Sequence, residues 1–270
     1  MSSSSPGSSN PRKKAAAARA EQLAKEKRRD TMVKIIGGVV VAVVVIGIVV
    51  LAVVSSKKDA PVAGPTANPS NTLPTGVDPS TYGFVINASV PATAPKVDIW
   101  EDYQCPACKL FEESGSGPAI VAAGKAGKYN VQLRPTTFLD TNLRNTASAA
   151  ATSAWGCAIN AGKGLEYHAT VFANQPATEG TGYTTAQLLD FGKQAGITGA
   201  AFDTFTSCVN ANTFLGWAAN STAEFNKQAF TKSGGTPAVF VNGKELANTN
   251  GVYGDPAKLL AAIDQAAAAK

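Results

Sequence analysis

Two cysteines separated by two residues, Cys105 and Cys108, constrain this chain more than any other feature. They lie in the stretch DIWEDYQCPACKLFEES, directly after residues 96–100, whose pattern predicts a β-strand. The residues that follow are typical of a helix, with Pro106 near the first turn, where its missing N–H costs little. Such a pair can be an inert disulfide, half of a zinc site or a reactive dithiol. Which of the three the pair is depends partly on whether it lies in the cytoplasm or in an exported part of the chain.

An apolar run over residues 35–54 predicts a transmembrane anchor. It holds 20 uncharged residues, which as a helix at ~1.5 Å per residue would cross a ~30 Å hydrocarbon core. Nine Lys or Arg precede it against three acids, so residues 1–34 are expected to be a cytoplasmic basic tail and the rest of the chain to be exported. A cleaved signal peptide is the alternative, but its apolar stretch is usually ~7–15 residues, and only a poor cleavage site follows here.

Residues 55–80 are dense in Pro, Gly, Ser, Thr and Asn, which predicts a tether between the anchor and a folded domain. Beyond the tail, 15 basic side chains are balanced by 16 acidic ones, so the formal charge of +5 belongs to the tail. The exported part therefore has no electrostatic case for binding nucleic acid. A single tether without a heptad pattern favours a monomer.

The exported part begins with strands and a broken helix. Short β-segments are expected at residues 82–87, 96–100 and 129–139. The helix after the cysteines is expected to kink or break at residues 115–118, whose sequence is GSGP.

A long helical block and a terminal hairpin follow. About 90 residues carry Ala-rich segments with apolar positions three or four apart, which is typical of helices. Ala238–Val241 with an Asn242-Gly243 turn predicts a β-hairpin. Asp255 and Pro256 then form the expected cap and first residue of a final helix.

Taken together, these features resemble the DsbA-like thiol-disulfide oxidoreductases, most closely the membrane-anchored versions of Gram-positive actinobacteria. The resemblance rests on WEDYQCPAC, YHATVFANQP and GGTPAVFVNG, and covers residues 82–270. It implies an α/β protein with a thioredoxin-like fold and an inserted helical domain, preceded by a single transmembrane helix. The thioredoxin-like domain would comprise residues 82–139 and 233–270, and the helical insertion residues 140–232.

Four cysteines allow three disulfide pairings. Zinc is not expected, because Cys157 and Cys208 stand 51 positions apart and His168 is the only histidine. Export to an oxidising compartment makes disulfides the default. Cys105 and Cys108 are expected to pair with each other, and Cys157 with Cys208 as a structural disulfide between two helices. A second redox relay is the alternative for that pair. No metal and no cofactor are expected.

The expected chemistry is thiol-disulfide exchange, with an inert disulfide as the alternative. At a helix start, free backbone N–H groups and the helix dipole stabilise a thiolate, which lowers a cysteine pKa from ~8.5 to ~3.5–7.5. A low pKa makes Cys105 a good leaving group and stabilises the reduced form, so the disulfide is oxidising. Cys108 is expected to be the more buried, resolving thiol.

Three further positions follow from the family pattern. Thr236 and Pro237 stand where thioredoxin-like proteins carry a cis-proline loop for substrate binding, with a trans proline at a strand start as the alternative. The acid that many thioredoxin-like proteins carry six residues before the first cysteine is replaced by Ile99. Glu101 shares its strand face and is the candidate for proton transfer, with the neighbouring Asp102 as a second possibility. Both acids could otherwise form a solvated strand end.

Four other side chains are expected to be structural. His168 has no positioned partner in the sequence and is expected to be a packed helix residue. Trp100, Phe111 and Phe138 are expected in the core or at its rim, where exposed rings would help a groove to bind unfolded peptides.

The sequence therefore predicts a membrane-tethered, extracytoplasmic enzyme that forms disulfides in exported proteins. Its partners would be unfolded or reduced exported proteins and, by family resemblance, a membrane quinone-linked thiol oxidase. A reductase or isomerase of the same fold is one alternative, because the Pro-Ala dipeptide between the cysteines does not settle the direction of electron flow. A non-catalytic peptide-binding module is the other.

Overall fold

The computed structural model describes residues 72–228 and 234–269. The predicted tail, the predicted anchor at residues 35–54 and most of the predicted tether lie outside the described residues. Within the described ranges, no helix is both long enough and apolar enough to cross a membrane.

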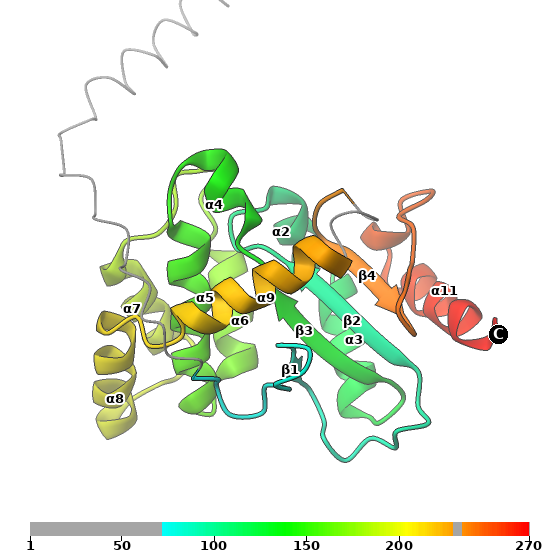
Figure 1. Ribbon diagram of the computed structural model, residues 1–270, viewed down its shortest axis with the longest axis horizontal. Coiled ribbons are helices and arrows are strands. Elements are labelled where there is room, and N and C mark those ends of the chain that lie inside the picture. The colour runs from blue at the N-terminus through cyan, green and yellow to red at the C-terminus, as the bar shows by residue number, and fades with distance from the viewer. Residues whose placement is uncertain (1–71, 229–233, 270) are drawn as a thin grey trace, which may run out of the picture. The chain divides into compact units, whose positions relative to one another are not determined.

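A five-stranded sheet in the order β1-β3-β2-β4-β5 lies at the centre of this part of the chain (Figure 1). The pair β2–β3 is parallel, and the pairs β1–β3, β2–β4 and β4–β5 are antiparallel. The strands are β1 (Phe84–Val85), β2 (Lys96–Glu101), β3 (Asn130–Pro135), β4 (Ala238–Val241) and β5 (Lys244–Glu245).

Central strand β2 ends at the cysteine pair. Its Val97 and Ile99 are fully buried, as are Val131 and Leu133 at the matching positions of β3. Helices α3 and α9 both contact β3, and α11 contacts β4. A strand covered in this way carries apolar residues and delivers its C-terminal end into the protein interior.

Helices α2 (Pro106–Glu113) and α3 (Ser116–Lys125) link the parallel strands. The predicted break between them falls at Gly115, whose φ of 84° lies in the left-handed region that glycine adopts without steric cost. The break lets α2 run away from the end of β2 and α3 return along β3.

Six described helices fill the region between β3 and β4. Helix α4, the first of the six, was not predicted. The sequence favoured β-structure up to Leu139, whereas β3 ends at Pro135 and α4 begins at Phe138. The reason is tertiary: the backbone N–H of Leu139 donates to a carboxylate oxygen of Asp102 at 3.1 Å. The six are α4 (Phe138–Leu143), α5 (Ala147–Asn160), α6 (Gly164–Ala173), α7 (Thr185–Gln194), α8 (Gly199–Asn210) and α9 (Leu215–Gln228).

The core runs continuously from the sheet into these helices. Trp155 of α5 contacts the rings of Tyr103 and Trp217. Trp100 and Phe111 are buried, and Phe138 packs against a second cluster around Trp100.

Cys157 and Cys208 form a disulfide that joins α5 to α8, with the Cα atoms 5.8 Å apart. Both helices belong to the same block, as the sequence predicts. The bond therefore fixes helical packing on the far side of α5 from the central sheet.

The C-terminal elements match their local signals. Asn242 and Gly243 both have positive φ, 49° and 77°, as a two-residue type I′ hairpin turn requires. After the short 3-10 turn η1 (Val252–Gly254), Asp255 caps α11 (Pro256–Ala268) by accepting hydrogen bonds from two backbone N–H groups of its first turn.

Candidate active site

The two cysteines of the pair are thiols in this structure, and helix α2 gives them unequal positions. Cys105 is the N-cap residue of α2, with an extended backbone, and Pro106 occupies the first helical position. Cys108 lies one turn further into the helix and faces the core. Cys105 retains 6% of its surface exposed and Cys108 none, so Cys105 is the more accessible of two buried thiols.

Their surroundings separate the pKa values of the two thiols. A hydrogen bond from the Cys108 thiol lowers the pKa of Cys105 to about 6, against the effect of burial. The Thr236 side chain and two backbone N–H groups at the start of α2 act in the same direction. At pH 7 such a thiol is about 90% thiolate. Burial first, and then the hydrogen bond to Cys105 and its charge, raise the pKa of Cys108 well above its ordinary value.

The loop before β4 faces the pair. The Thr236–Pro237 peptide bond is cis. The thiol of Cys105 donates to the carbonyl oxygen of Thr236 at 3.3 Å. The hydroxyl oxygen of Thr236 is buried and makes no hydrogen bond with the described residues, so it is free to donate to a thiolate.

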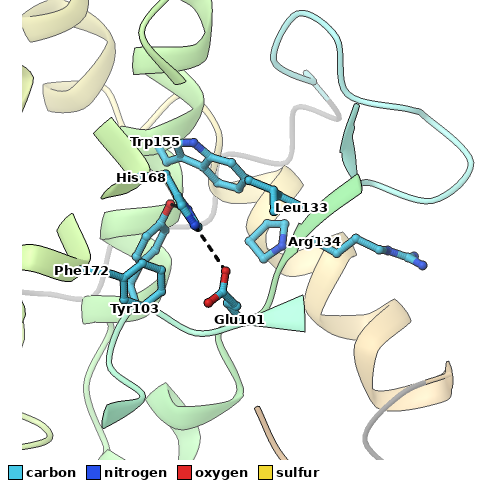
Figure 2. A pocket seen from close by; sticks show the side chains of 8 residues that line it. Glu101, Tyr103, Leu133, Arg134, Trp155, His168 and Phe172 are labelled. Carbon is cyan, nitrogen blue, oxygen red and sulfur yellow. Dashed lines mark hydrogen bonds and ion pairs between the residues drawn. The ribbon is translucent and has the colours of Figure 1, made fainter. Parts of the chain in front are cut away.

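Glu101, the last residue of β2, is buried and its charge acts on the cysteines. Its Oε2 atom is 3.3 Å from Nε2 of His168 on α6, and Figure 2 shows the carboxylate and the imidazole pointing toward one another. Oε1 of Glu112, on α2, is 3.9 Å from the same nitrogen. The other ring nitrogen, Nδ1, is 2.9 Å from the hydroxyl of Tyr103.

The expectation of a histidine without partners was therefore wrong. His168 is buried as predicted, but it has partners from two other segments: Glu101 and Tyr103 at the end of β2, and Glu112 on α2. One sequence signal could have found Glu112: it stands four residues after Cys108 on the same helix, so both side chains share a face of α2.

The charges of this cluster act on one another and on the cysteines. Burial, with the charge of Glu112, raises the pKa of Glu101 to about 7, while His168 opposes the rise. Burial lowers the pKa of His168, but the two carboxylates outweigh it and raise the pKa to about 10. The charge of Glu101 also contributes to the raised pKa of Cys108. The structure thus puts Glu101 within electrostatic reach of the buried thiol.

A comparison with known proteins identifies the family to which this chain belongs. A family profile described as thioredoxin matches residues 90–265, about two thirds of the chain. The chain belongs to the thioredoxin family. Among curated proteins, no significant match was found.

Solved structures narrow the placement within the thioredoxin family. The thiol-disulfide oxidoreductase MdbA from Corynebacterium diphtheriae is 22% identical, with 72% of this chain and 94% of that chain covered and a TM-score of 0.55. MdbA from Actinomyces oris is 20% identical, with 76% and 97% covered and a TM-score of 0.58. At these identities the likeness shows the fold alone.

DsbA from Mycobacterium tuberculosis is 26% identical, with 69% of this chain and 93% of that chain covered and a TM-score of 0.54. The predicted resemblance to DsbA-like enzymes of actinobacteria is therefore confirmed. The chain is a DsbA-like dithiol-disulfide oxidoreductase with a thioredoxin-like α/β fold.

Asp102 connects residues 102–105, the cysteine loop between β2 and α2, to helices α4 and α5. Its carboxylate accepts hydrogen bonds from the Ser148 hydroxyl at 2.5 Å, from the Gln104 backbone N–H at 2.9 Å and from the Leu139 N–H at 3.1 Å. Burial raises the pKa of Asp102 to about 7. The structure therefore gives Asp102 a set of hydrogen-bond partners in the loop and in the helices, whereas the charge of Glu101 acts on Cys108.

Gln175 and Tyr183 hold the same loop from the other side. The Gln175 side-chain amide donates to the carbonyl oxygens of Tyr103 at 2.8 Å and Cys105 at 3.1 Å. The Tyr183 hydroxyl donates to the Tyr103 carbonyl at 2.6 Å. Gln175 belongs to the quoted stretch YHATVFANQP, but its role was not predicted, because nothing local to it points to a loop 70 positions away.

Proposed function

We propose that this protein is an extracytoplasmic disulfide-forming oxidase, held at the membrane by residues 35–54, that uses Cys105 and Cys108 to oxidise exported proteins. The observation that carries the proposal is the inequality of the two thiols. Cys105 combines a lowered pKa with a reachable sulfur, whereas Cys108 combines a raised pKa with complete burial. An inert structural pair would have no need of this difference.

The reaction proceeds in two exchanges from the oxidised pair. A substrate thiolate attacks the sulfur of Cys105, forming a mixed disulfide, and Cys108 leaves with the electron pair of the broken bond and takes up a proton. A second substrate thiolate then attacks the substrate sulfur of the mixed disulfide, and Cys105 leaves as a thiolate. The substrate loses two electrons in forming its disulfide, and the enzyme pair gains them.

The lowered pKa of Cys105 favours this direction. At pH 7, ionisation of a thiol with a pKa of about 6 stabilises the reduced enzyme by about 1.4 kcal/mol more than ionisation of an ordinary cysteine does. For a two-electron couple this corresponds to about 30 mV toward a more oxidising disulfide. The same ionisation makes Cys105 the better leaving group in the second exchange.

Glu101 is the proposed proton-transfer residue for Cys108. With a pKa raised to about 7 by burial and by Glu112, it can hold or release a proton at neutral pH, which suits general acid-base work. When Cys108 leaves in the first exchange it needs a proton. When the pair is re-oxidised, that proton must go.

Substrate binding is assigned to the loop of Thr236 and Pro237. In the reduced enzyme its Thr236 carbonyl accepts from the thiol of Cys105, so backbone polar groups lie beside the reacting sulfur. An extended peptide can add its own backbone hydrogen bonds to such a segment. This supports recognition of unfolded chains with little demand on their side chains.

Re-oxidation is assigned to a membrane quinone-linked thiol oxidase, which would remove two electrons from the pair of Cys105 thiolate and Cys108 thiol, with release of the Cys108 proton. A membrane anchor and a tether over residues 55–80 would keep the enzyme near such a partner. The proposal also includes action as a monomer.

Three measurements test the proposal: oxidation of a peptide, trapping of mixed disulfides, and labelling of Cys105 in intact cells. Full-length oxidised protein should convert a reduced two-cysteine peptide to its disulfide in stoichiometric amount. Cys108→Ala should accumulate mixed disulfides with exported proteins in cells, and Cys105→Ala should not. After reduction of intact cells with a membrane-impermeant reductant, a membrane-impermeant thiol reagent should label Cys105. Labelling only after lysis would refute the extracytoplasmic site. Failure to oxidise the peptide, with reduction of disulfides instead, would indicate a reductase.

A further inference from the structure

We propose that the buried cluster of Glu101, Glu112 and His168 is a binding site for a divalent transition metal, with Zn²⁺ as its best-fitting ion. No local pattern in the sequence predicts this site, because the three residues lie on β2, α2 and α6. The inference is independent of the proposed direction of thiol exchange, but a Glu101 carboxylate that coordinates a metal cannot also take up the Cys108 proton, so metal binding would replace the proton-transfer role of Glu101.

The spacing of the ligand atoms suits a single ion. One ligand atom from each residue can be chosen so that all lie within 4.8 Å of one another. With metal–ligand distances of 2.0–2.2 Å, neighbouring ligands of a tetrahedral zinc site stand about 3.3 Å apart. Glu101 and His168 already meet this value at 3.3 Å. Glu112, at 3.9 Å from the imidazole nitrogen, needs only a small side-chain movement.

The cluster also holds polar atoms that make ion-pair contacts without a hydrogen bond. Both carboxylate oxygens of Glu101 and Nε2 of His168 are buried and make no hydrogen bond with the described residues. Each of the two residues is 6% exposed. Buried polar groups in folded proteins are nearly always hydrogen-bonded, and here one oxygen of Glu101 faces the imidazole nitrogen (Figure 2). An ion between Oε2 and Nε2 would satisfy both atoms.

A neighbouring hydroxyl orients the imidazole as in known zinc sites. Nδ1 of His168 is 2.9 Å from the Tyr103 hydroxyl, which fixes the ring so that Nε2 points at the carboxylates. Zinc-binding histidines almost always use their second nitrogen in such a contact.

There is room for a fourth ligand and a reason for Glu112 to stay in place. A cavity of about 10 Å³ lies beside Glu101 and His168, which is about the space of one water molecule. A zinc site with three protein ligands takes water as its fourth. A Cβ atom at Gly117 would lie 1.7 Å from Oε1 of Glu112, so a larger residue there would force the carboxylate out of its present position.

The ligand set selects the kind of metal. One imidazole with two carboxylates suits zinc and similar transition metals, whereas Ca²⁺ and Mg²⁺ prefer oxygen ligands alone. Without a metal, a protonated His168 would hold the two carboxylates by charge alone. The experiment distinguishes these two states of the cluster.

Zinc binding should be measured by titration calorimetry on the full-length protein with Cys105 and Cys108 oxidised to their disulfide, so that no thiolate can chelate. We expect one Zn²⁺ per chain and no Ca²⁺ binding. Glu112→Gln should weaken zinc binding at least tenfold, and Tyr103→Phe about tenfold. Glu113→Gln is the matched control, because this neighbouring carboxylate of α2 is half-exposed and should leave zinc affinity unchanged.

Two results would overturn the proposal: no saturable zinc binding, or equal zinc affinity in Glu112→Gln and the wild type. If Glu112→Gln fails to fold, Co²⁺ substitution in the wild type decides. Intense visible bands of a four-coordinate ion are expected, and only the weak bands of an octahedral ion would refute the site.

Discussion

The hydroxyl of Thr236 offers a direct perturbation of the Cys105 thiolate. Thr236→Val keeps the shape and β-branching of the side chain and removes one oxygen. In the structure that oxygen has no hydrogen-bond partner, yet the Thr236 side chain contributes to the lowered pKa of Cys105. The substitution should therefore remove a donor to the thiolate and leave the packing of the loop unchanged.

The size of the effect follows from the energy of one such bond. A hydrogen bond to a charged group contributes about 1.5 kcal/mol at the low end, which corresponds to about one pKa unit. The pKa of Cys105 should rise from about 6 to about 7. At pH 6 the thiolate fraction would fall from about 50% to about 9%, roughly a fivefold drop. At pH 9 both proteins would be almost fully ionised.

Alkylation of the reduced protein by iodoacetamide measures this fraction, because Cys108 is buried and has a raised pKa. Thr236→Val should react about fivefold more slowly than the wild type at pH 6, and the two rates should converge at high pH. Thr152→Val is the matched control, since Thr152 also has a buried hydroxyl without a partner, but on α5. Superimposable pH profiles for Thr236→Val and the wild type would refute this account of the thiolate.

Three further predictions concern the support of the site. The double variant Cys157→Ala/Cys208→Ala removes the second disulfide, which joins residues 51 positions apart. Its free energy of unfolding, measured in urea, should be about 4 kcal/mol lower than that of the wild type. The pKa of Cys105 should be unchanged, and a shifted pKa would contradict a purely structural role. Because the pKa of Asp102 is raised to about 7 in the folded state, its contribution to stability is present at low pH and lost as pH rises through 7. Between pH 4 and 8 the wild type should lose about 4 kcal/mol through this group, and Asp102→Asn should lack that loss; parallel pH curves in urea unfolding would count against it. Gln175→Ala removes two hydrogen bonds to the backbone carbonyls of Tyr103 and Cys105. The variant should lose about 1–3 kcal/mol of stability and should exchange disulfides with a model peptide more slowly. An unchanged exchange rate would show that Gln175 is not needed to keep the loop in place.

Local signals in the sequence predicted the elements that local chemistry controls. The strand before Cys105, the break at Gly115 and the Asn242-Gly243 turn each depend on residues within a few positions of one another. The same holds for the cap at Asp255. In each case the backbone geometry is set by the residue type itself, so the pattern was sufficient.

What the sequence could not predict depends on contacts between distant segments. Helix α4 forms where residue propensity favoured a strand, because Asp102 binds the backbone at Leu139. His168 acquired its partners from β2 and α2, and its pKa reflects their charges rather than its own helix. The position of Gln175 beside the cysteine loop follows from the tertiary fold alone, since its partners lie about 70 positions away.

The equilibrium redox potential of the Cys105–Cys108 pair tests the central claim most directly. It should be measured in the purified full-length protein against glutathione buffers, with the state of Cys157 and Cys208 followed by mass. We expect a potential well above the value of about −270 mV for thioredoxin, with the Cys157–Cys208 disulfide intact throughout. A potential at or below that of thioredoxin would contradict an oxidase and place the protein among the disulfide reductases.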